Sequence, residues 1–315
     1  MLRIGIDLGG TKTEGVLMDA AGHIVHRERR ATPADKGYEA ILENLAGLVR
    51  DLDRRAGRAC HVGIGTPGAI STRTGLLKNS NTTCLNGKPI KQDLERLLAR
   101  EVRIANDANC FALSEALDGA GRGEPVVFGV ILGTGVGGGI VVNGQIVEGL
   151  QHIAGEWGHN VLEADGPECY CGKRGCVETF LSGPGLVRDY VTHGGESGLD
   201  AISIVARANA HDHIAQAALQ RYLERFGRAL SVVVNILDPH VIVLGGGMSN
   251  IKHLYRDGRD HLARAVFAAH GRANVALDRM SGASNDELRT RLVANVHGDS
   301  SGVRGAAQLW PTSAG

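Results

Sequence analysis

GIDLGGTKTEGVLMDAAGHIV, residues 5–25, and GVILGTGVGGGIVVNGQIV, residues 129–147, follow the same plan. Each has an apolar strand, a glycine-rich turn, a second strand and another turn that contains glycine. We expect two β-hairpins whose first turns use glycine because it adopts positive φ and has no Cβ to cover the backbone N–H groups. Exposed N–H groups of this kind bind phosphate. The repeat therefore predicts two related halves that hold one polyphosphate from both sides, with ATP as the candidate.

Common nucleotide-binding motifs do not account for these turns. The letters GxGxxG occur at 133–138 and at 63–68, but a dinucleotide-binding motif needs a helix after them. Residues 139–144 instead indicate a strand that ends in an Asn-Gly turn, and Pro67 with a polar turn follows the other match. A Walker A loop would need Gly-Lys-Ser/Thr at its end, whereas Gly10 is followed by Thr11 and then Lys12. An ordinary hairpin would explain either turn alone, whereas the duplication favours phosphate binding.

Composition and charge exclude several classes of partner. The chain has 315 residues, 43% of them hydrophobic, which is enough for two compact domains. Its 34 basic residues equal its 34 acidic residues, so no net field attracts nucleic acid or an anionic membrane. Because no apolar run approaches about 18 residues, we expect neither a membrane span nor a secretory signal. We expect a soluble cytoplasmic protein in which Cys60, Cys84 and Cys110 are reduced thiols in or near the core.

Strands and helices alternate along the chain, which predicts an α/β fold. Apolar spacing predicts helices at 38–55, 91–100, 109–117, 214–237 and 301–310, and strands at 2–7, 60–65, 102–105 and 241–244.

We place an N-terminal domain at 1–118 and a C-terminal domain at 119–300, with a glycine-rich hinge candidate at 118–124. The C-terminal domain contains a segment rich in Cys, Gly and Glu at 152–182. The closing segment, 301–315, is expected to pack back on the first domain.

His159, Cys169, Cys171 and Cys176 offer one imidazole and three thiolates, the ligand set of a closed tetrahedral zinc site. Glycines in the same loop would let it fold around an ion. Because the spacing is not that of an ordinary zinc knuckle, reduced thiols or a redox pair remain alternatives on the residues alone.

Several stretches then combine in one family resemblance. DLGGTKTE at 7–14, NDANC at 106–110, GEWGH at 155–159, CYCGKRGCVE at 169–178 and LSVVVNILDPHVIVLGGG at 230–247 resemble the ROK family of sugar kinases, in order and over essentially the whole chain. The ending HGDSSGVRGAAQLW is similar to bacterial fructokinases and mannofructokinases of that family. The resemblance implies the actin-like ATPase fold, a duplicated ribonuclease-H-like fold in which two domains flank an interdomain active-site cleft. It also implies a homodimer and makes a structural Zn²⁺ the preferred interpretation of the cysteine cluster.

The resemblance implies that Asp107 is the general base for the primary hydroxyl of the sugar, and that Asn106 binds a neighbouring hydroxyl. From the residues alone, Asp107 could instead be a helix N-cap. Asp7 is implied to organise Mg²⁺ and water around the phosphates, against the alternative of a structural hydrogen bond. Lys12 is expected at the phosphates, although an isolated lysine is by default a surface residue.

The remaining expected contacts are those with ATP and those with the sugar. ATP is expected to contact Asp7, Gly9, Gly10, Thr11, Lys12, Gly133, Thr134, Gly135, Gly245, Gly246 and Gly247. The last three of these could also be a mere strand-end turn. The family's sugar-contacting positions correspond to Gly68, Asn81, Asn106, Asp107, Glu156, His159 and Glu178. Zinc would hold His159 and the loop that bears Glu178. Cys84 stands where several family members have a tryptophan, a difference that bears on sugar preference.

Together these features predict ATP-dependent phosphorylation of the C6 hydroxyl of a hexose, with D-fructose as the first choice. Glucokinase, mannokinase and N-acetylglucosamine kinase are the alternatives with the same machinery. A sugar-sensing regulator is the alternative that is not an enzyme, and a base opposite two phosphate turns argues against it.

Overall fold

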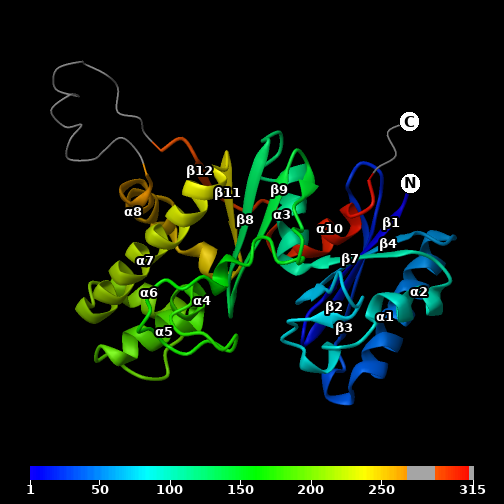
Figure 1. The fold of residues 1–315 in the computed structure, drawn as a ribbon, viewed down its shortest axis with the longest axis horizontal. Coiled ribbons are helices and arrows are strands. Elements are labelled where there is room, and N and C mark those ends of the chain that lie inside the picture. Colours follow the sequence, from blue (N-terminus) through cyan, green and yellow to red (C-terminus); the bar gives the residue numbers. More distant parts are fainter. Residues whose placement is uncertain (268–287, 312–315) are drawn as a thin grey trace. The chain divides into compact units, whose positions relative to one another are not determined.

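The computed structural model describes residues 1–267 and 288–311 (Figure 1). Its internal contacts divide the chain into two compact units. The first unit comprises Met1–Pro125, Gly139–Gly155 and Asn295–Gly315. The second comprises Val126–Gly138 and Glu156–Ala294. Residues 312–315 of the predicted closing segment lie outside the described residues.

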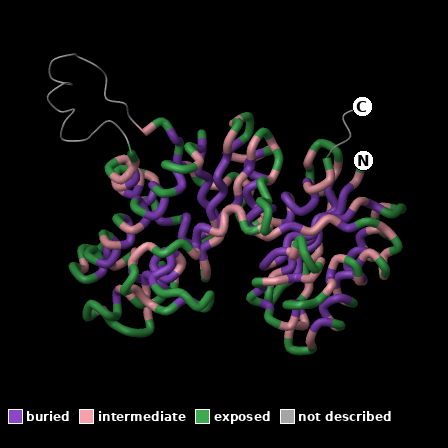
Figure 2. The backbone as a smooth tube through the Cα atoms, viewed as in Figure 1, coloured by how far each residue is buried: buried purple, intermediate pink, exposed green. Residues whose placement is uncertain are grey.

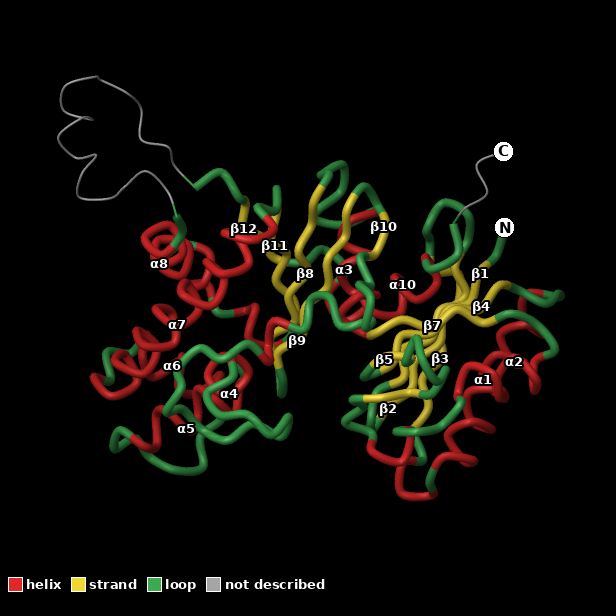
Figure 3. The backbone as a smooth tube through the Cα atoms, in the orientation of Figure 1, coloured by secondary structure: helices red, strands yellow, loops and turns green. Residues whose placement is uncertain are grey.

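The first unit is built on a five-stranded sheet of order β3-β2-β1-β4-β7 (Figure 3). Its strands are β1 (Arg3–Leu8), β2 (Lys12–Met18), β3 (Ile24–Ala31), β4 (His61–Thr66) and β7 (Val102–Asn106). The first three strands are antiparallel, whereas β1, β4 and β7 run parallel. The carboxyl ends of these three parallel strands therefore meet at one edge of the sheet.

Helices cover both faces of this sheet. The helices are α1 (Tyr38–Ala56), α2 (Ile90–Leu98), α3 (Asp107–Leu117) and α10 (Ser301–Gln308). Shorter elements are β5 (Ala69–Ile70), β6 (Leu77–Lys78) and the 3-10 helices η1 (Ala34–Lys36), η2 (Thr83–Leu85) and η6 (Gly298–Ser300). The predicted apolar stripe of α1 is buried in one cluster with Ile4, Ile6 and Leu8 of β1, which confirms the helix inferred from spacing. Figure 2 colours the buried parts of the backbone purple.

Helix α10 packs on the other face with almost no side chain between the backbones. A Cβ added to Gly5 of β1 would lie 2.2 Å from the carbonyl oxygen of Val303, and one added to Gly63 of β4 would lie 1.8 Å from that of Ala306. On the helix itself, a Cβ at Gly305 would lie 1.7 Å from the carbonyl oxygen of Cys110. Glycine is required at these positions because any side chain would push α10 away from the sheet and from α3.

The second sheet repeats the plan of the first. Its order is β10-β9-β8-β11-β12, with β8 (Val126–Leu132), β9 (Val136–Val142), β10 (Gln145–Ile146), β11 (Val241–Gly245) and β12 (Arg291–Ala294). Strands β8, β11 and β12 run parallel, and β9 and β10 are antiparallel. Both sheets place their strands in the chain order third, second, first, fourth, fifth. The repeat found in the sequence is therefore a repeat of topology.

Helices and turns complete the second unit. They are α4 (Val177–Leu181), α5 (Gly183–Thr192), α6 (Ala201–Asn209), α7 (His213–Leu237), α8 (Asp257–Ala265) and the 3-10 helices η3 (Trp157–His159), η4 (Gly247–Asn250) and η5 (Lys252–Tyr255). Asp212 caps α7 by accepting a hydrogen bond from the N–H of Ala215 at 2.9 Å. The helix ends at Leu237, as predicted, where Asp238 adopts a φ of 46° before Pro239. None of the helices in the described ranges has the length and apolarity needed to cross a bilayer.

One expectation about the hairpin turns is wrong. Gly9, Gly10, Gly133 and Gly135 do not adopt positive φ. Glycine is needed there for the absence of a side chain, since a Cβ at Gly9 would lie 2.8 Å from the carbonyl oxygen of Lys12, and one at Gly135 would lie 2.6 Å from Oε2 of Glu178. Positive φ occurs instead in the second turn of the second hairpin, where residues 143 and 144 have φ of 50° and 74°.

Candidate functional site

Asp107 lies where β7 runs into α3 at the carboxyl edge of the first sheet. Asn106, the last residue of β7, is the N-cap of α3, and its Oδ1 accepts hydrogen bonds from the N–H groups of Ala108 and Asn109 at 2.8 and 3.4 Å. The capping role that we considered for Asp107 is thus filled by its neighbour. Asp107 itself accepts a hydrogen bond from Ala108 N–H at 2.9 Å, and burial raises the pKa of its carboxyl group above the usual range.

Asp7 is the next-to-last residue of β1 at the same edge, opposite Glu14 of β2 and Gly65 of β4 in register. Burial raises the pKa of Asp7 to about 7, and the negative charges of Asp107 and Glu14 add to the rise, whereas Lys12 opposes it. This edge therefore concentrates carboxylates that repel one another. A divalent cation or a proton relieves such repulsion, so the donors suit the Mg²⁺ role predicted for Asp7.

The first glycine turn joins β1 to β2 beside these carboxylates. It is closed by a hydrogen bond from Gly9 N–H to the carbonyl oxygen of Lys12 at 3.0 Å, and residues 10–12 are exposed. Lys12 is half exposed, with Nζ 3.7 Å from Oε2 of the buried Glu14. Lys12 is therefore one of three cations around Glu14, and Arg27 and Arg29 lie closer to its carboxylate.

Thr82 is a residue of this region that sequence reasoning missed. Its hydroxyl is buried and has no hydrogen-bond partner among the described residues. A Cβ added to Gly10 would lie 3.4 Å from this hydroxyl oxygen, so Thr82 packs against the first glycine turn. No signal in the sequence separates it from its neighbours Asn81 and Thr83.

The predicted sugar contacts of the first unit are partly brought together. Nδ2 of Asn106 donates a hydrogen bond to the carbonyl oxygen of Gly68 at 3.3 Å. Gly68 has a φ of 83°, and a Cβ there would lie 2.3 Å from the carbonyl oxygen of Lys78. The chain around Gly68 thus packs on the loop that leads to Asn81, which is exposed. Gly68, Asn106 and Asp107 form one group, with Asn81 on the neighbouring loop.

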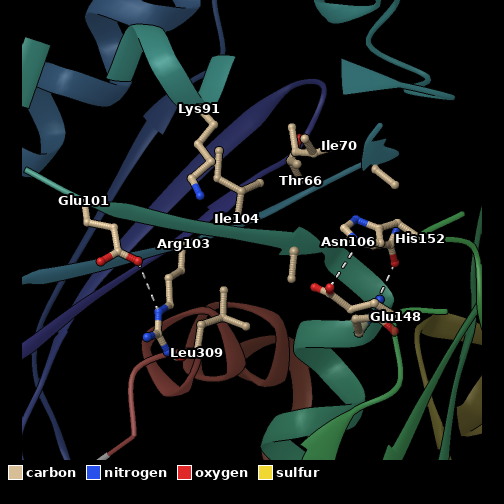
Figure 4. Close-up of a pocket in the computed structure, with 13 residues that line it drawn as sticks. Thr66, Ile70, Lys91, Glu101, Arg103, Ile104, Asn106, Glu148, His152 and Leu309 are labelled. Atoms are coloured by element: carbon tan, nitrogen blue, oxygen red, sulfur yellow. Dashed lines mark hydrogen bonds and ion pairs between the residues drawn. The ribbon is translucent and has the colours of Figure 1, made fainter. Parts of the chain in front are cut away.

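A pocket of about 410 Å³ adjoins this group (Figure 4). Asn106 and Thr66 form part of its wall, and Oε2 of Glu148 lies 3.3 Å from Nε2 of His152 on another part. Asp107 does not line it, so the pocket lies beside the predicted base without containing it. No sequence motif indicates this pocket, because its walls come from segments far apart in the chain.

The second glycine turn joins β8 to β9 and is held by three hydrogen bonds. Gly133 N–H donates to the carbonyl oxygen of Gly135 at 2.9 Å, and Gly183 N–H donates to that of Gly133 at 2.8 Å. The N–H of Val136 donates to Oε2 of Glu178 at 3.0 Å. Thr134, at the tip of the turn, is exposed.

Residues 245–247, which we expect to contact ATP, lie beside the second glycine turn. Gly245 is the last residue of β11, Gly246 and Gly247 follow it, and Gly246 has a φ of 80°. A Cβ at Gly246 would lie 2.4 Å from the carbonyl oxygen of Leu132, which directly precedes Gly133. The second unit therefore brings together the two segments that we expected to contact the nucleotide there.

The imidazole and the three thiols also come together. The ligand atoms of His159, Cys169, Cys171 and Cys176 all lie within 4.8 Å of one another. Nδ1 of His159 lies 3.6 Å from Sγ of Cys169, and Sγ of Cys171 lies 3.6 Å from that of Cys176. A zinc ion with Zn–S bonds of about 2.3 Å places tetrahedral thiolates about 3.8 Å apart. The four residues therefore fit a tetrahedral zinc ion.

Tyr170 lies between this cluster and the predicted sugar contacts of the second unit. Its hydroxyl is 3.1 Å from Nε2 of His159, on the side of the ring away from Cys169. Burial, with the negative charges of Glu178 and Glu156, raises the pKa of Tyr170 to about 12. The largely exposed Tyr170 thus contacts His159 and lies within the electrostatic influence of Glu156 and Glu178. Sequence reasoning missed Tyr170, whose only signal is its position between two of the cysteines.

The predicted site residues fall into two groups, one in each unit. The group in the first unit is Asp7, Gly9, Gly10, Thr11, Lys12, Gly68, Asn81, Asn106 and Asp107. The group in the second unit is Gly133, Thr134, Gly135, Glu156, His159, Cys169, Cys171, Cys176, Glu178, Gly245, Gly246 and Gly247.

Comparison with protein families identifies the chain. The model of the ROK family matches residues 3–313, and the chain belongs to this family. The chain is 39% identical to the N-acetyl-D-glucosamine kinase of Yersinia enterocolitica, over 97% of this chain and 98% of that protein.

Solved structures agree with the family. A ROK hexokinase from Thermus thermophilus is 30% identical and superposes with a TM-score of 0.79, covering 98% of this chain and 97% of that one. A ROK glucokinase from Streptomyces griseus, in complex with glucose and AMPPNP, is 27% identical with a TM-score of 0.75, covering 98% and 99%. The predicted fold class, the duplicated α/β fold of actin-like ATPases, is confirmed, and the chain is a sugar kinase of this family. The preference for fructose finds no such support, because the curated relative is named for N-acetyl-D-glucosamine.

Proposed function

We propose that this chain transfers the γ-phosphoryl group of ATP to the C6 hydroxyl of N-acetyl-D-glucosamine. The observation that carries the choice of sugar is the 39% identity, over nearly the full length of both chains, to a kinase named for that sugar. N-Acetylglucosamine was one of our alternatives to fructose, and it now replaces fructose as the main candidate. Glucose and mannose remain secondary substrates to be tested.

Asp107 supplies the base in this proposal. Its carboxylate accepts the proton of the C6 hydroxyl as the oxygen attacks phosphorus, and a pKa raised by burial makes it a stronger base than an exposed aspartate. Asn106 holds the start of α3 in place through its cap and presents Nδ2, which lies 3.3 Å from Gly68 O, to a neighbouring hydroxyl. The two residues thus divide proton transfer and positioning between them.

The two glycine turns would bind the phosphates through their backbone N–H groups. In the first unit, Lys12 and the carboxylate of Asp7 flank the turn. Mg²⁺, when bound, would neutralise charge that develops on the transferred group. In the second unit, Gly245, Gly246 and Gly247 would contact the adenosine. Binding of ATP is supported by the Streptomyces griseus relative, which was solved with AMPPNP.

Glu156, His159 and Glu178 would bind sugar hydroxyls from the second unit. Zn²⁺ would be held by His159, Cys169, Cys171 and Cys176 with all four positions filled, so it would be structural. It would fix the ring of His159 and the start of α4, and thereby preorganise the sugar contacts. A homodimer in the cytoplasm stays a prediction from the family resemblance.

A coupled assay of ADP release over four sugars tests this proposal. We expect the highest kcat/KM with N-acetyl-D-glucosamine and lower values with glucose, mannose and fructose. A clear preference for fructose would restore our first choice of substrate and reject the present one. Sugar binding without ADP release from any of the four would instead favour the sugar-sensing regulator.

A further inference from the structure

The carboxylate of Glu178 connects the predicted sugar contacts of the second unit with the predicted phosphate-binding turn of the same unit. Glu178 lies in the first turn of α4, two residues after Cys176, and we expect it to contact the sugar. Yet its Oε2 accepts the hydrogen bond from Val136 N–H at 3.0 Å, at the end of the second glycine turn. A residue predicted to bind the phosphoryl acceptor thus holds the loop predicted to bind the donor.

The close approach is built into the sequence on both sides. A Cβ added to Gly135 would lie 2.6 Å from Oε2 of Glu178, so only glycine leaves room for the carboxylate. Behind the turn, a Cβ at Gly158 would lie 2.1 Å from the carbonyl oxygen of Val136. Nε1 of Trp157 also donates to the carbonyl oxygen of Gly137 at 3.1 Å. The turn therefore rests on the segment that carries Glu156 and His159.

We propose that Glu178 is a positioning residue for the donor phosphates, which orders the second glycine turn through Val136 N–H and couples sugar binding to nucleotide binding. The inference rests on the proposed function. The hydrogen bond from Val136 N–H to Glu178 fixes the orientation of the peptide groups that precede Val136. The N–H groups of residues 134 and 135 then remain for phosphate. A hydrogen bond to a charged acceptor is strong enough to select one conformation of a short loop.

The carboxylate has two oxygens, and this permits the coupling. Among the described residues, hydrogen bonding to Glu178 side-chain oxygens involves only Oε2. Oε1 is therefore available to a sugar hydroxyl. A hydroxyl bound there would hold the carboxylate still and so strengthen the hold on the turn, since each bond restricts the rotation of the same group.

Nucleotide affinity without sugar separates this role from a sugar contact alone. We would titrate wild type, Glu178→Ala and Glu178→Gln with AMPPNP and Mg²⁺ in the absence of sugar. We expect Glu178→Ala to raise the Kd for AMPPNP about tenfold, the change for the loss of roughly 1.4 kcal/mol. Glu178→Gln keeps an acceptor oxygen for Val136 N–H and should lose about threefold or less. Glu196→Ala is the matched control and should leave this Kd unchanged, because this exposed glutamate of the second unit pairs with Arg207 and is not one of the predicted site residues.

Amide hydrogen exchange over residues 133–137 provides a second readout that needs no activity. Exchange should be faster in Glu178→Ala than in wild type, with Glu178→Gln between them. An AMPPNP Kd for Glu178→Ala within twofold of wild type, or unchanged exchange in the turn, would overturn the inference. Failure of the proposed function is a different result, namely no ADP release by the wild type with any of the sugars. In that case the exchange measurement still decides whether Glu178 orders the turn.

Discussion

The side chain of Asn106, and not that of its neighbour Asp107, caps helix α3. Both side chains accept a hydrogen bond from the N–H of Ala108, but only Asn106 also accepts one from the N–H of the next residue, Asn109. The helix would therefore keep its cap if Asp107 lost its charge. This separation makes the role of Asp107 testable by substitution, because Asp107→Asn changes the charge and leaves the cap.

The raised pKa of Asp107 predicts how the stability of Asp107→Asn depends on pH. Because the folded protein binds this proton more tightly than the unfolded chain, the wild type loses stability as pH rises from the ordinary aspartate pKa of about 4 through the folded pKa. Asn cannot ionise and avoids this loss. Thermal unfolding should show a higher Tm for Asp107→Asn at pH 8, by roughly 2–4 °C if the gain is about 1 kcal/mol. The difference should vanish below about pH 4. A Tm for Asp107→Asn below that of the wild type at pH 8 would contradict the burial of this charge.

Removal of the metal should weaken stability and sugar binding together. Cys171→Ser removes one of four ligands, and it should lower the zinc content, lower the Tm and raise the KM for sugar by about tenfold. Elemental analysis, thermal unfolding and steady-state kinetics measure the three effects. Cys84→Ser is the control for metal content, because Cys84 packs against the core of the first unit away from the cluster. Unchanged kinetics in protein verified to be free of zinc would refute the role of the metal.

The close backbone packing of α10 on the first sheet predicts that replacing Gly63 by alanine strongly destabilises the fold. Gly63→Ala would place its Cβ 1.8 Å from the carbonyl oxygen of Ala306, so α10 must move. We expect a loss of about 3 kcal/mol or more in the free energy of unfolding. In Gly47→Ala, within α1, the new Cβ would meet only the end of the Arg30 side chain at 3.4 Å, and this variant should gain about 0.5–1 kcal/mol. Urea unfolding of both variants checks the prediction, which fails if Gly63→Ala is as stable as Gly47→Ala.

Local pattern and repetition predicted much of the fold. The apolar spacing of α1 and α7 and the two glycine hairpins depend on neighbours in the chain, and these elements formed as predicted. The repeat also anticipated the shared strand order of the two sheets, because equivalent sequences form equivalent strands.

The features that the sequence did not predict depend on contacts between residues far apart in the chain. The bond between Glu178 and Val136 joins residues 42 positions apart, and the unpaired hydroxyl of Thr82 meets Gly10 only after folding. The reason for glycine in the first turns was also missed, because steric exclusion by a distant side chain leaves no local signature, whereas positive φ is a local property. Tyr170 acquires its surroundings in the same way.

Comparison of wild type with Asp107→Asn in the phosphorylation of N-acetyl-D-glucosamine tests the central claim most directly. The assay follows ADP release at saturating sugar and ATP and identifies the product by mass spectrometry and NMR. We predict N-acetyl-D-glucosamine 6-phosphate from the wild type, and a kcat for Asp107→Asn lower by about 10²- to 10⁴-fold with a nearly unchanged KM for the sugar. An active wild type whose Asp107→Asn variant turns over nearly as fast would contradict the account.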